Sequence, residues 1–87
     1  MTAYRIEYSP AAEKTLRRMK DARLSAPIKR AIASLGENPR PPGCLKLVGE
    51  LDQWRVRVGD WRVIYRIEDG RLVVLVVTVA PRGGVYG

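Results

Sequence analysis

Residues 54–65 alternate apolar and basic side chains on both sides of a Gly59-Asp60 dipeptide, and this pattern constrains the fold most strongly. Alternation with a period of two indicates strands, and Gly-Asp between two such runs is typical of a two-residue hairpin turn. Cross-strand partners count outward from the turn. The hairpin therefore predicts three pairs, which are Val58 with Trp61, Arg57 with Arg62, and Val56 with Val63.

The two faces of this predicted hairpin differ in chemistry. One face carries Arg55, Arg57 and Arg62. The other is apolar and must face the core, with Trp54, Val56, Val58, Trp61, Val63 and Tyr65. Burial of the apolar face fixes the register, because a one-residue slip would exchange the two faces. Like charges that face each other on a sheet are unfavourable by up to roughly 1 kcal/mol, so Arg57 opposite Arg62 favours an anion bound between them.

The first half of the chain predicts one strand and two helices. Residues 4–8 alternate as a half-buried strand. Ser9 and Pro10 then suit the N-cap and the first position of a helix. Ser25 is predicted to cap a second helix, which Gly36 ends. The inward faces of the two helices are predicted to carry Ala12, Leu16, Met19, Ile28, Ala31, Ile32 and Leu35.

The second half predicts strands. Residues 38–43 hold three prolines and form a stiff connector. Beyond the hairpin, Asp69-Gly70 is expected to form another two-residue turn, with Glu68 facing Arg71 across it. The strand that follows, at residues 71–79, is almost wholly apolar and should be flanked by partners on both sides. The order predicts a single α+β domain at residues 1–87, with an antiparallel helix hairpin packed on one face of an antiparallel meander.

Charge predicts the class of partner. Sixteen Lys and Arg against nine Asp and Glu give a formal net charge of +7, which favours nucleic acid but also suits a membrane surface or an acidic protein. A basic stripe on the first helix is either a solvated face or a contact for ribosomal RNA or another partner. The candidate RNA-binding residues are Lys14, Arg17, Arg18, Lys20, Arg23 and Lys46.

Cysteine and hydropathy predict the compartment. A lone Cys44 cannot form an intrachain disulfide, and without histidine the chain has no Cys/His cluster for zinc. No stretch at the start has the length of a signal-peptide core, and the longest apolar run, residues 72–80, is far shorter than the ~20 residues of a spanning helix. We therefore expect a cytoplasmic protein that needs no membrane, metal or cofactor.

Four segments together resemble the RelE/ParE superfamily of bacterial and archaeal toxins, and the RelE branch most closely. They are LKLVGEL at residues 45–51, WRVRV at 54–58, DWRVIY at 60–65 and VAPRGGVY at 79–86. The resemblance implies a metal-independent endoribonuclease that enters the ribosomal A site and cuts messenger RNA there. It also implies a co-expressed antitoxin, which for this chain should be acidic.

The resemblance also implies roles for five residues. Arg55 and Arg57 match two basic residues, usually lysines, that act in proton abstraction or charge stabilisation. Arg62 matches an arginine that stabilises the phosphate, and Arg82 a proposed acid or leaving-group stabiliser. Tyr86 matches an aromatic that stacks on a base or assists the attacking 2′-hydroxyl. Without the resemblance, Arg82 and Tyr86 would be read as ordinary tail residues.

Elementary chemistry constrains these roles. Cleavage of RNA through its own 2′-hydroxyl needs alignment of that oxygen, stabilisation of charge on the phosphate, and help for the leaving oxygen. Arginine serves the second need but is a poor general base, so Tyr86 is the better candidate base. Two alternatives are a ParE-like inhibitor of DNA gyrase, a group whose members generally lack the full basic set and terminal tyrosine, and a non-catalytic RNA-binding module.

Overall fold

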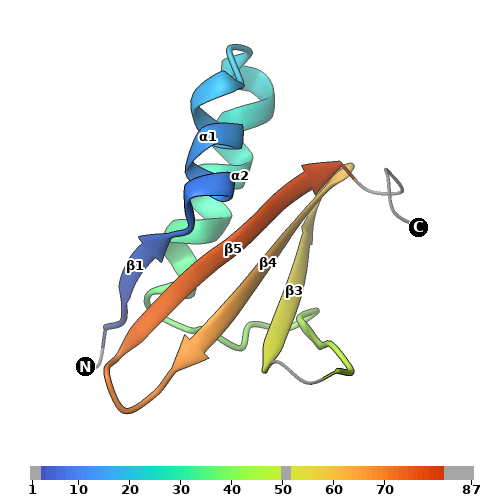
Figure 1. Ribbon diagram of the computed structural model, residues 1–87. Helices are drawn as coiled ribbons and strands as arrows, with labels where there is room; N and C mark the ends of the chain where they lie inside the picture. The colour runs from blue at the N-terminus through green and yellow to red at the C-terminus, as the bar shows by residue number, and fades with distance from the viewer. Residues whose placement is uncertain (1–2, 50–51, 82–87) are drawn as a thin grey trace.

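The computed structural model describes residues 3–49 and 52–81 (Figure 1). In this part of the chain the elements are β1 (Arg5–Tyr8), α1 (Pro10–Arg18), α2 (Ala22–Leu35), β2 (Leu45–Lys46), β3 (Gln53–Val58), β4 (Trp61–Glu68) and β5 (Val73–Pro81). The predicted α+β class is confirmed. The short strand β2 was not predicted.

The described strands form one mixed sheet in the order β1-β5-β4-β3-β2. Strands β3, β4 and β5 are the predicted antiparallel meander, and β5 is flanked by β1 and β4 as expected. β1 pairs with β5 in parallel. The parallel pairing follows from the path of the chain, because two antiparallel helices return it to the end of the sheet where β1 began (Figure 1).

The predicted register of the β3–β4 hairpin is confirmed at all three pairs. Gly59 adopts a φ of +60° in the turn, a left-handed conformation that glycine reaches without the penalty of a Cβ atom. Turn chemistry and the apolar face therefore agree on one register.

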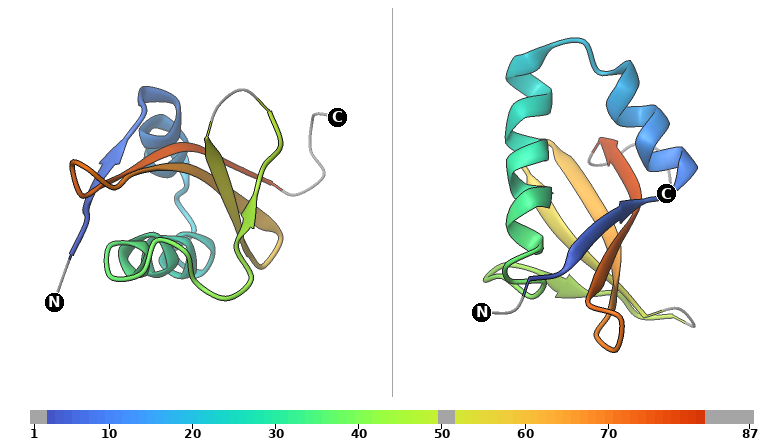
Figure 2. Two further views of the ribbon diagram at one scale, coloured as in Figure 1. Left: turned by 90° about the horizontal axis from the view of Figure 1, so that it is seen from below. Right: turned by 90° about the vertical axis from the view of Figure 1, so that its left-hand side faces the viewer.

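The core lies between the apolar face of the sheet and the helices. α2 contributes Ile28, Ile32 and Leu35, while α1 lies along β5 and contributes Ala12. The sheet contributes Val56, Val63, Tyr65, Ile67, Val74, Val76 and Val79. Figure 2 shows the two helices on the same side of the loop that joins them, with the chain running in opposite directions along them. α2 covers the apolar face, and α1 reaches the same core from the edge of the sheet.

The ends of α1 and α2 test the predicted caps. Ser9 caps α1 as predicted, and its hydroxyl accepts a hydrogen bond from the Ala12 N–H at 3.1 Å. The prediction for Ser25 is wrong, because Ser25 lies inside α2 and is buried. Asp21 caps α2 instead, since its carboxylate accepts a hydrogen bond from the Arg23 N–H at 2.9 Å.

The predicted two-residue turn at Asp69-Gly70 is also wrong. The loop includes Leu72, which donates its N–H to the Asp69 carbonyl at 3.3 Å and adopts a φ of +55°. Leu72, not a glycine, takes the left-handed conformation in this longer loop, and β5 begins at Val73. The predicted pairing of Glu68 with Arg71 is wrong as well, because Glu68 lies opposite Val73. The two side chains still meet within the turn, where Arg71 Nη1 donates to Glu68 Oε1 at 2.6 Å.

Gly36 ends α2 as predicted, for a reason of space rather than conformation. Its carbonyl accepts the Tyr4 N–H at 2.7 Å, and a Cβ atom at Gly36 would lie 3.0 Å from the Tyr4 carbonyl oxygen. This close approach ties the end of α2 to the strand β1.

The proline-rich connector is held at Pro39 and at Arg40, and a further hydrogen bond anchors the partner of Arg40. The buried Tyr65 hydroxyl donates to the Pro39 carbonyl at 2.7 Å, and burial raises the pKa of Tyr65. Arg40 Nη2 donates to Asp69 Oδ2 at 2.9 Å, and the Tyr4 hydroxyl donates to Asp69 Oδ1 at 2.6 Å. Both partners lower the pKa of Asp69, with Arg40 the larger cause.

Candidate nucleic-acid interface

The face of the sheet that points away from the core carries four arginines, which we call the arginine face. They are Arg55 and Arg57 from β3, and Arg62 and Arg66 from β4. Arg57 lies directly opposite Arg62, as predicted, and Gln53 lies opposite Arg66. Alternation along each strand places all four on one side, because successive strand residues point to opposite faces.

Arg66 was not among the predicted site residues. The signal for it was present, since Arg66 continues the alternation that places Arg62 on this face. It was missed because it follows Tyr65, where the predicted hairpin segment ended.

Two donors of the arginine face lack acceptors in the described part of the chain. The Nε atoms of Arg55 and Arg66 are buried, and neither has a hydrogen-bond partner in residues 3–49 or 52–81. A buried donor without an acceptor costs about 1–3 kcal/mol, and more when it is charged. Such donors favour binding of an anion with several oxygens, and forked guanidinium donors match phosphate.

The same surface of the sheet carries acidic residues at its other end, and these are paired. Arg66 on β4 pairs with Leu75 on β5, and Leu75 pairs in turn with Glu7 on β1, so these three residues form one row across the sheet. Glu68 follows Arg66 by two residues on β4 and therefore lies on the same face. Glu7 Oε2 lies 3.0 Å from Arg5 Nη2, and Glu68 Oε1 lies 2.6 Å from Arg71 Nη1. We call Arg5, Glu7, Glu68 and Arg71 the paired cluster.

Lys46 lies on the opposite side of the sheet from the arginine face. It pairs in register with Trp54, and its Nζ lies 3.2 Å from Asp52 Oδ1. Lys46 Nζ and Arg40 Cζ lie 5.7 Å and 5.2 Å from the centre of the Trp54 ring, distances that suit cation–π contacts. As predicted, Trp54 packs against the core, and the same holds for Trp61.

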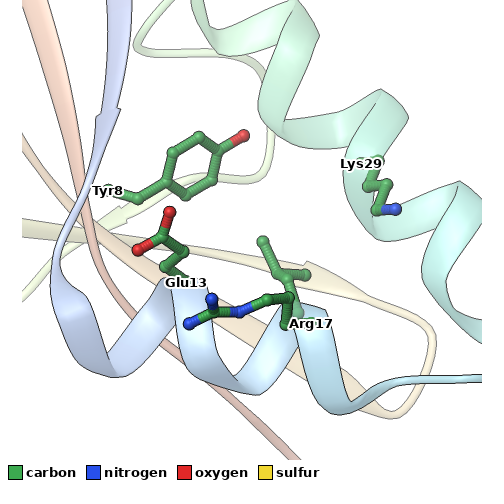
Figure 3. Close-up of a pocket in the computed structure, with 5 residues that line it drawn as sticks. Tyr8, Glu13, Arg17 and Lys29 are labelled. Atoms are coloured by element: carbon green, nitrogen blue, oxygen red, sulfur yellow. The ribbon is translucent and has the colours of Figure 1, made fainter.

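The other candidate RNA-binding residues are exposed and lie away from the arginine face. They are Lys14, Arg17 and Arg18 on α1, Lys20 in the loop, and Arg23 in the first turn of α2. Arg17 lines an open cavity of about 360 Å³ between the helices, together with Tyr8, Glu13, Leu16 and Lys29 (Figure 3). Partial burial raises the pKa of Tyr8. Arg23 lines a second cavity, of about 260 Å³, beside the β3–β4 turn.

The predicted residues Arg82 and Tyr86 lie outside the described residues. The last described residue, Pro81, pairs with Trp61, and the preceding Ala80 pairs with Arg62. The described part of the chain therefore ends beside the Arg57–Arg62 pair.

The described part of the chain offers neither a metal cluster nor a membrane-spanning helix. Within it, no group of three or more His, Cys, Asp or Glu side chains could hold a metal ion. No helix there is long and apolar enough to cross a membrane.

Comparisons with known proteins agree with this fold. The family model described as the ParE toxin of the type II toxin-antitoxin system, parDE, matches residues 6–86. No curated protein matches the sequence. Among solved structures, the archaeal RelE–RelB complex from Pyrococcus horikoshii OT3 contains a chain that is 28% identical, with a TM-score of 0.79 and coverage of 97% of this chain and 100% of that one.

Two further structures are similar. The toxin-antitoxin complex RelBE2 from Mycobacterium tuberculosis contains a chain that is 26% identical, with a TM-score of 0.77 and coverage of 94% of both chains. The isolated E. coli RelE toxin is 24% identical, with a TM-score of 0.81 and coverage of 95% of this chain and 88% of that one, and shows similarity of fold.

Proposed function

Because this chain belongs to the RelE/ParE superfamily of toxins, we propose that it is a ribosome-dependent endoribonuclease that cuts messenger RNA in the ribosomal A site. The observation that carries the proposal is the register of the β3–β4 hairpin, which holds Arg57 directly opposite Arg62. On the same face, the buried Nε atoms of Arg55 and Arg66 have no acceptor among the described residues. A scissile phosphate between the Arg57 and Arg62 side chains would relieve their repulsion.

The chemistry proposed for this face needs no metal ion. Arg55, Arg57 and Arg62 grip the scissile phosphate and stabilise the charge that develops on it. Arg82 stabilises the leaving oxygen, and Tyr86 orients or activates the attacking 2′-hydroxyl. The reaction is confined to RNA, because DNA lacks that hydroxyl. The ribosome supplies alignment of the substrate, which a small open face provides poorly.

A cognate antitoxin is the second proposed partner. Both the P. horikoshii and the M. tuberculosis neighbours were solved as toxin-antitoxin complexes. The formal net charge of +7 favours an acidic antitoxin chain that covers the basic surface and keeps the toxin inactive in the cytoplasm. Lys14, Arg17, Arg18, Lys20, Arg23 and Lys46 are proposed contacts for ribosomal RNA or for this antitoxin.

A second candidate function is inhibition of DNA gyrase. It is favoured by the match of residues 6–86 to the ParE family model. The arginine face and the sequence ending in Arg82 and Tyr86 favour the nuclease, because ParE-like members generally lack this combination.

Primer extension on a defined messenger separates the two functions. The protein is incubated with the messenger alone and with programmed ribosomes that have an empty A site. Cuts at the A-site codon that require ribosomes support the nuclease. No cut by folded protein, together with inhibition of gyrase supercoiling, would establish the alternative.

The roles proposed for Arg82 and Tyr86 have their own test. Arg82→Ala and Tyr86→Phe should leave ribosome binding nearly unchanged while cleavage falls about 10²–10³-fold, the usual effect of losing a transition-state donor or a positioned proton-transfer group. Equal losses in binding and cleavage would contradict these roles.

A further inference from the structure

We infer that Arg66, with Arg55 and Gln53, forms a second phosphate subsite on the arginine face, which binds a flanking phosphate of the RNA strand cut at the Arg57–Arg62 pair. The subsite rests on the proposed function, because it binds the same strand. Arg66 and Gln53 act in substrate binding alone and do not reach the reacting atoms. Arg55, which also grips the scissile phosphate, lies between the two phosphates.

The first support is the state of the guanidinium donors. The Nε atoms of Arg55 and Arg66 are both buried without a partner among the described residues. Each belongs to a side chain on the same face of neighbouring strands, because Arg55 is the diagonal neighbour of Arg66 across β3 and β4. Diagonal neighbours lie about 7–8 Å apart at the backbone, so two long side chains can converge on one anion.

The second support is that nearby carboxylates do not pair with Arg66. Glu68 is two residues along the same strand face, and Glu7 lies across β5 in the same row. Both carboxylates are bound by arginines of the paired cluster, and no ion pair of Arg66 is found in the described part of the chain. Arg66 therefore keeps its full charge for an external anion.

The third support is the direction of the face. Along β3, Arg55 lies two residues before Arg57, and Gln53 lies two residues before Arg55 and directly opposite Arg66. Each step covers two residues, about 6.8 Å along an antiparallel strand. An RNA backbone that runs along β3 and β4 would therefore meet guanidinium groups in succession, with the Gln53 amide as a further donor. Beyond Arg66 the acidic residues of the paired cluster end the basic track.

Binding of short oligonucleotides blocked at the 2′-hydroxyl tests the subsite without cleavage. A 2′-O-methyl dinucleotide has one internucleotide phosphate, and a tetranucleotide also reaches the flanking position. Arg66→Gln should weaken binding of the tetranucleotide about tenfold, the loss expected for one charged contact, and leave the dinucleotide within about twofold. The slope of log affinity against log salt concentration for the tetranucleotide should become shallower by the amount expected for about one phosphate contact.

Two variants act as controls. Arg71→Gln removes an arginine of the paired cluster that Glu68 already holds, so both affinities should stay unchanged. Arg66→Lys keeps the charge but loses the forked geometry, so its affinity for the tetranucleotide should lie between those of the wild type and Arg66→Gln. The melting temperature of Arg66→Gln should not fall, because no residue in the described ranges accepts a hydrogen bond from the Arg66 Nε.

The outcomes separate the subsite from the function. Equal weakening of both oligonucleotides by Arg66→Gln, or no weakening of either, would overturn the subsite even if the wild type cuts messenger RNA. A selective loss for the tetranucleotide would support the subsite even if the wild type fails to cut on the ribosome, in which case only the nuclease proposal falls. Arg66 would have a structural role instead if Arg66→Gln lowers the melting temperature strongly while Arg66→Lys leaves the affinity for the tetranucleotide unchanged.

Discussion

Two groups of arginines on one surface of the sheet differ in their partners. In the paired cluster, Arg5 and Arg71 are held by Glu7 and Glu68, at separations from 2.6 Å to 4.0 Å. On the arginine face, Arg55 and Arg66 have buried Nε atoms without acceptors in the described part of the chain. The same residue type thus serves two purposes on one surface.

The difference indicates which arginines are available for a ligand. Exposed ion pairs contribute only about 0–1 kcal/mol each, so the paired cluster adds little stability, but its carboxylates neutralise that end of the sheet. At the other end, two like charges face each other where Arg57 lies opposite Arg62. A negatively charged ligand is the partner that we propose for this end.

The largest expected effect comes from breaking the arginine face at its centre. Arg57→Gln or Arg62→Gln should lower cleavage of ribosome-bound messenger about 10²-fold or more, because each removes charge stabilisation at the phosphate. The matched change Arg71→Gln in the paired cluster should leave cleavage within about twofold. Single-turnover cleavage assays measure both, and similar losses at Arg57 and Arg71 would remove the distinction between the two groups.

A smaller effect should follow from converting part of the arginine face into a second paired cluster. Gln53→Glu places a carboxylate directly opposite Arg66, and an opposite-charge pair across strands contributes about 0.2–1 kcal/mol. We expect the free energy of unfolding, measured in denaturant, to rise slightly in Gln53→Glu, and RNA binding to weaken about tenfold. Gln53→Ala is the control, since it removes the amide without adding charge. Unchanged RNA binding in Gln53→Glu would contradict the assignment.

The smallest expected effect concerns pH and a third arginine that is paired, Arg40. Its guanidinium lowers the pKa of Asp69 below the ordinary value of 3.8, so the pair stabilises the folded protein above that pH. The stabilisation is lost as pH falls through the lowered pKa. Asp69→Asn should therefore melt at a lower temperature than wild type at neutral pH, and the difference should shrink towards zero in strong acid. A difference that persists there would contradict this origin.

The sequence predicted the hairpin well because two independent signals coincided. Gly59-Asp60 specified the turn, and the apolar face specified the same register, so Arg57 opposite Arg62 followed directly. The later turn had a single signal, the Asp69-Gly70 dipeptide. There the left-handed conformation fell on Leu72, and the expected two-residue turn did not form.

Other features depend on contacts that no local pattern encodes. The parallel pairing of β1 with β5 is set by the path through both helices, and β2 is only two residues long. The candidate site was predicted where it followed strand alternation. That Arg66 forms no ion pair with a described residue could not be predicted, because it depends on Glu7 and Glu68 pairing with other arginines.

The most direct test of the central claim observes the guanidinium Nε–H groups themselves. Nitrogen-15 NMR of the full chain would follow the arginine Nε–H signals during titration with a 2′-O-methyl tetranucleotide. We predict that Arg55, Arg57, Arg62 and Arg66 shift and exchange more slowly with water, while Arg5, Arg40 and Arg71 stay unchanged. Equal shifts in both groups, or shifts confined to the arginines already paired with carboxylates, would contradict the account.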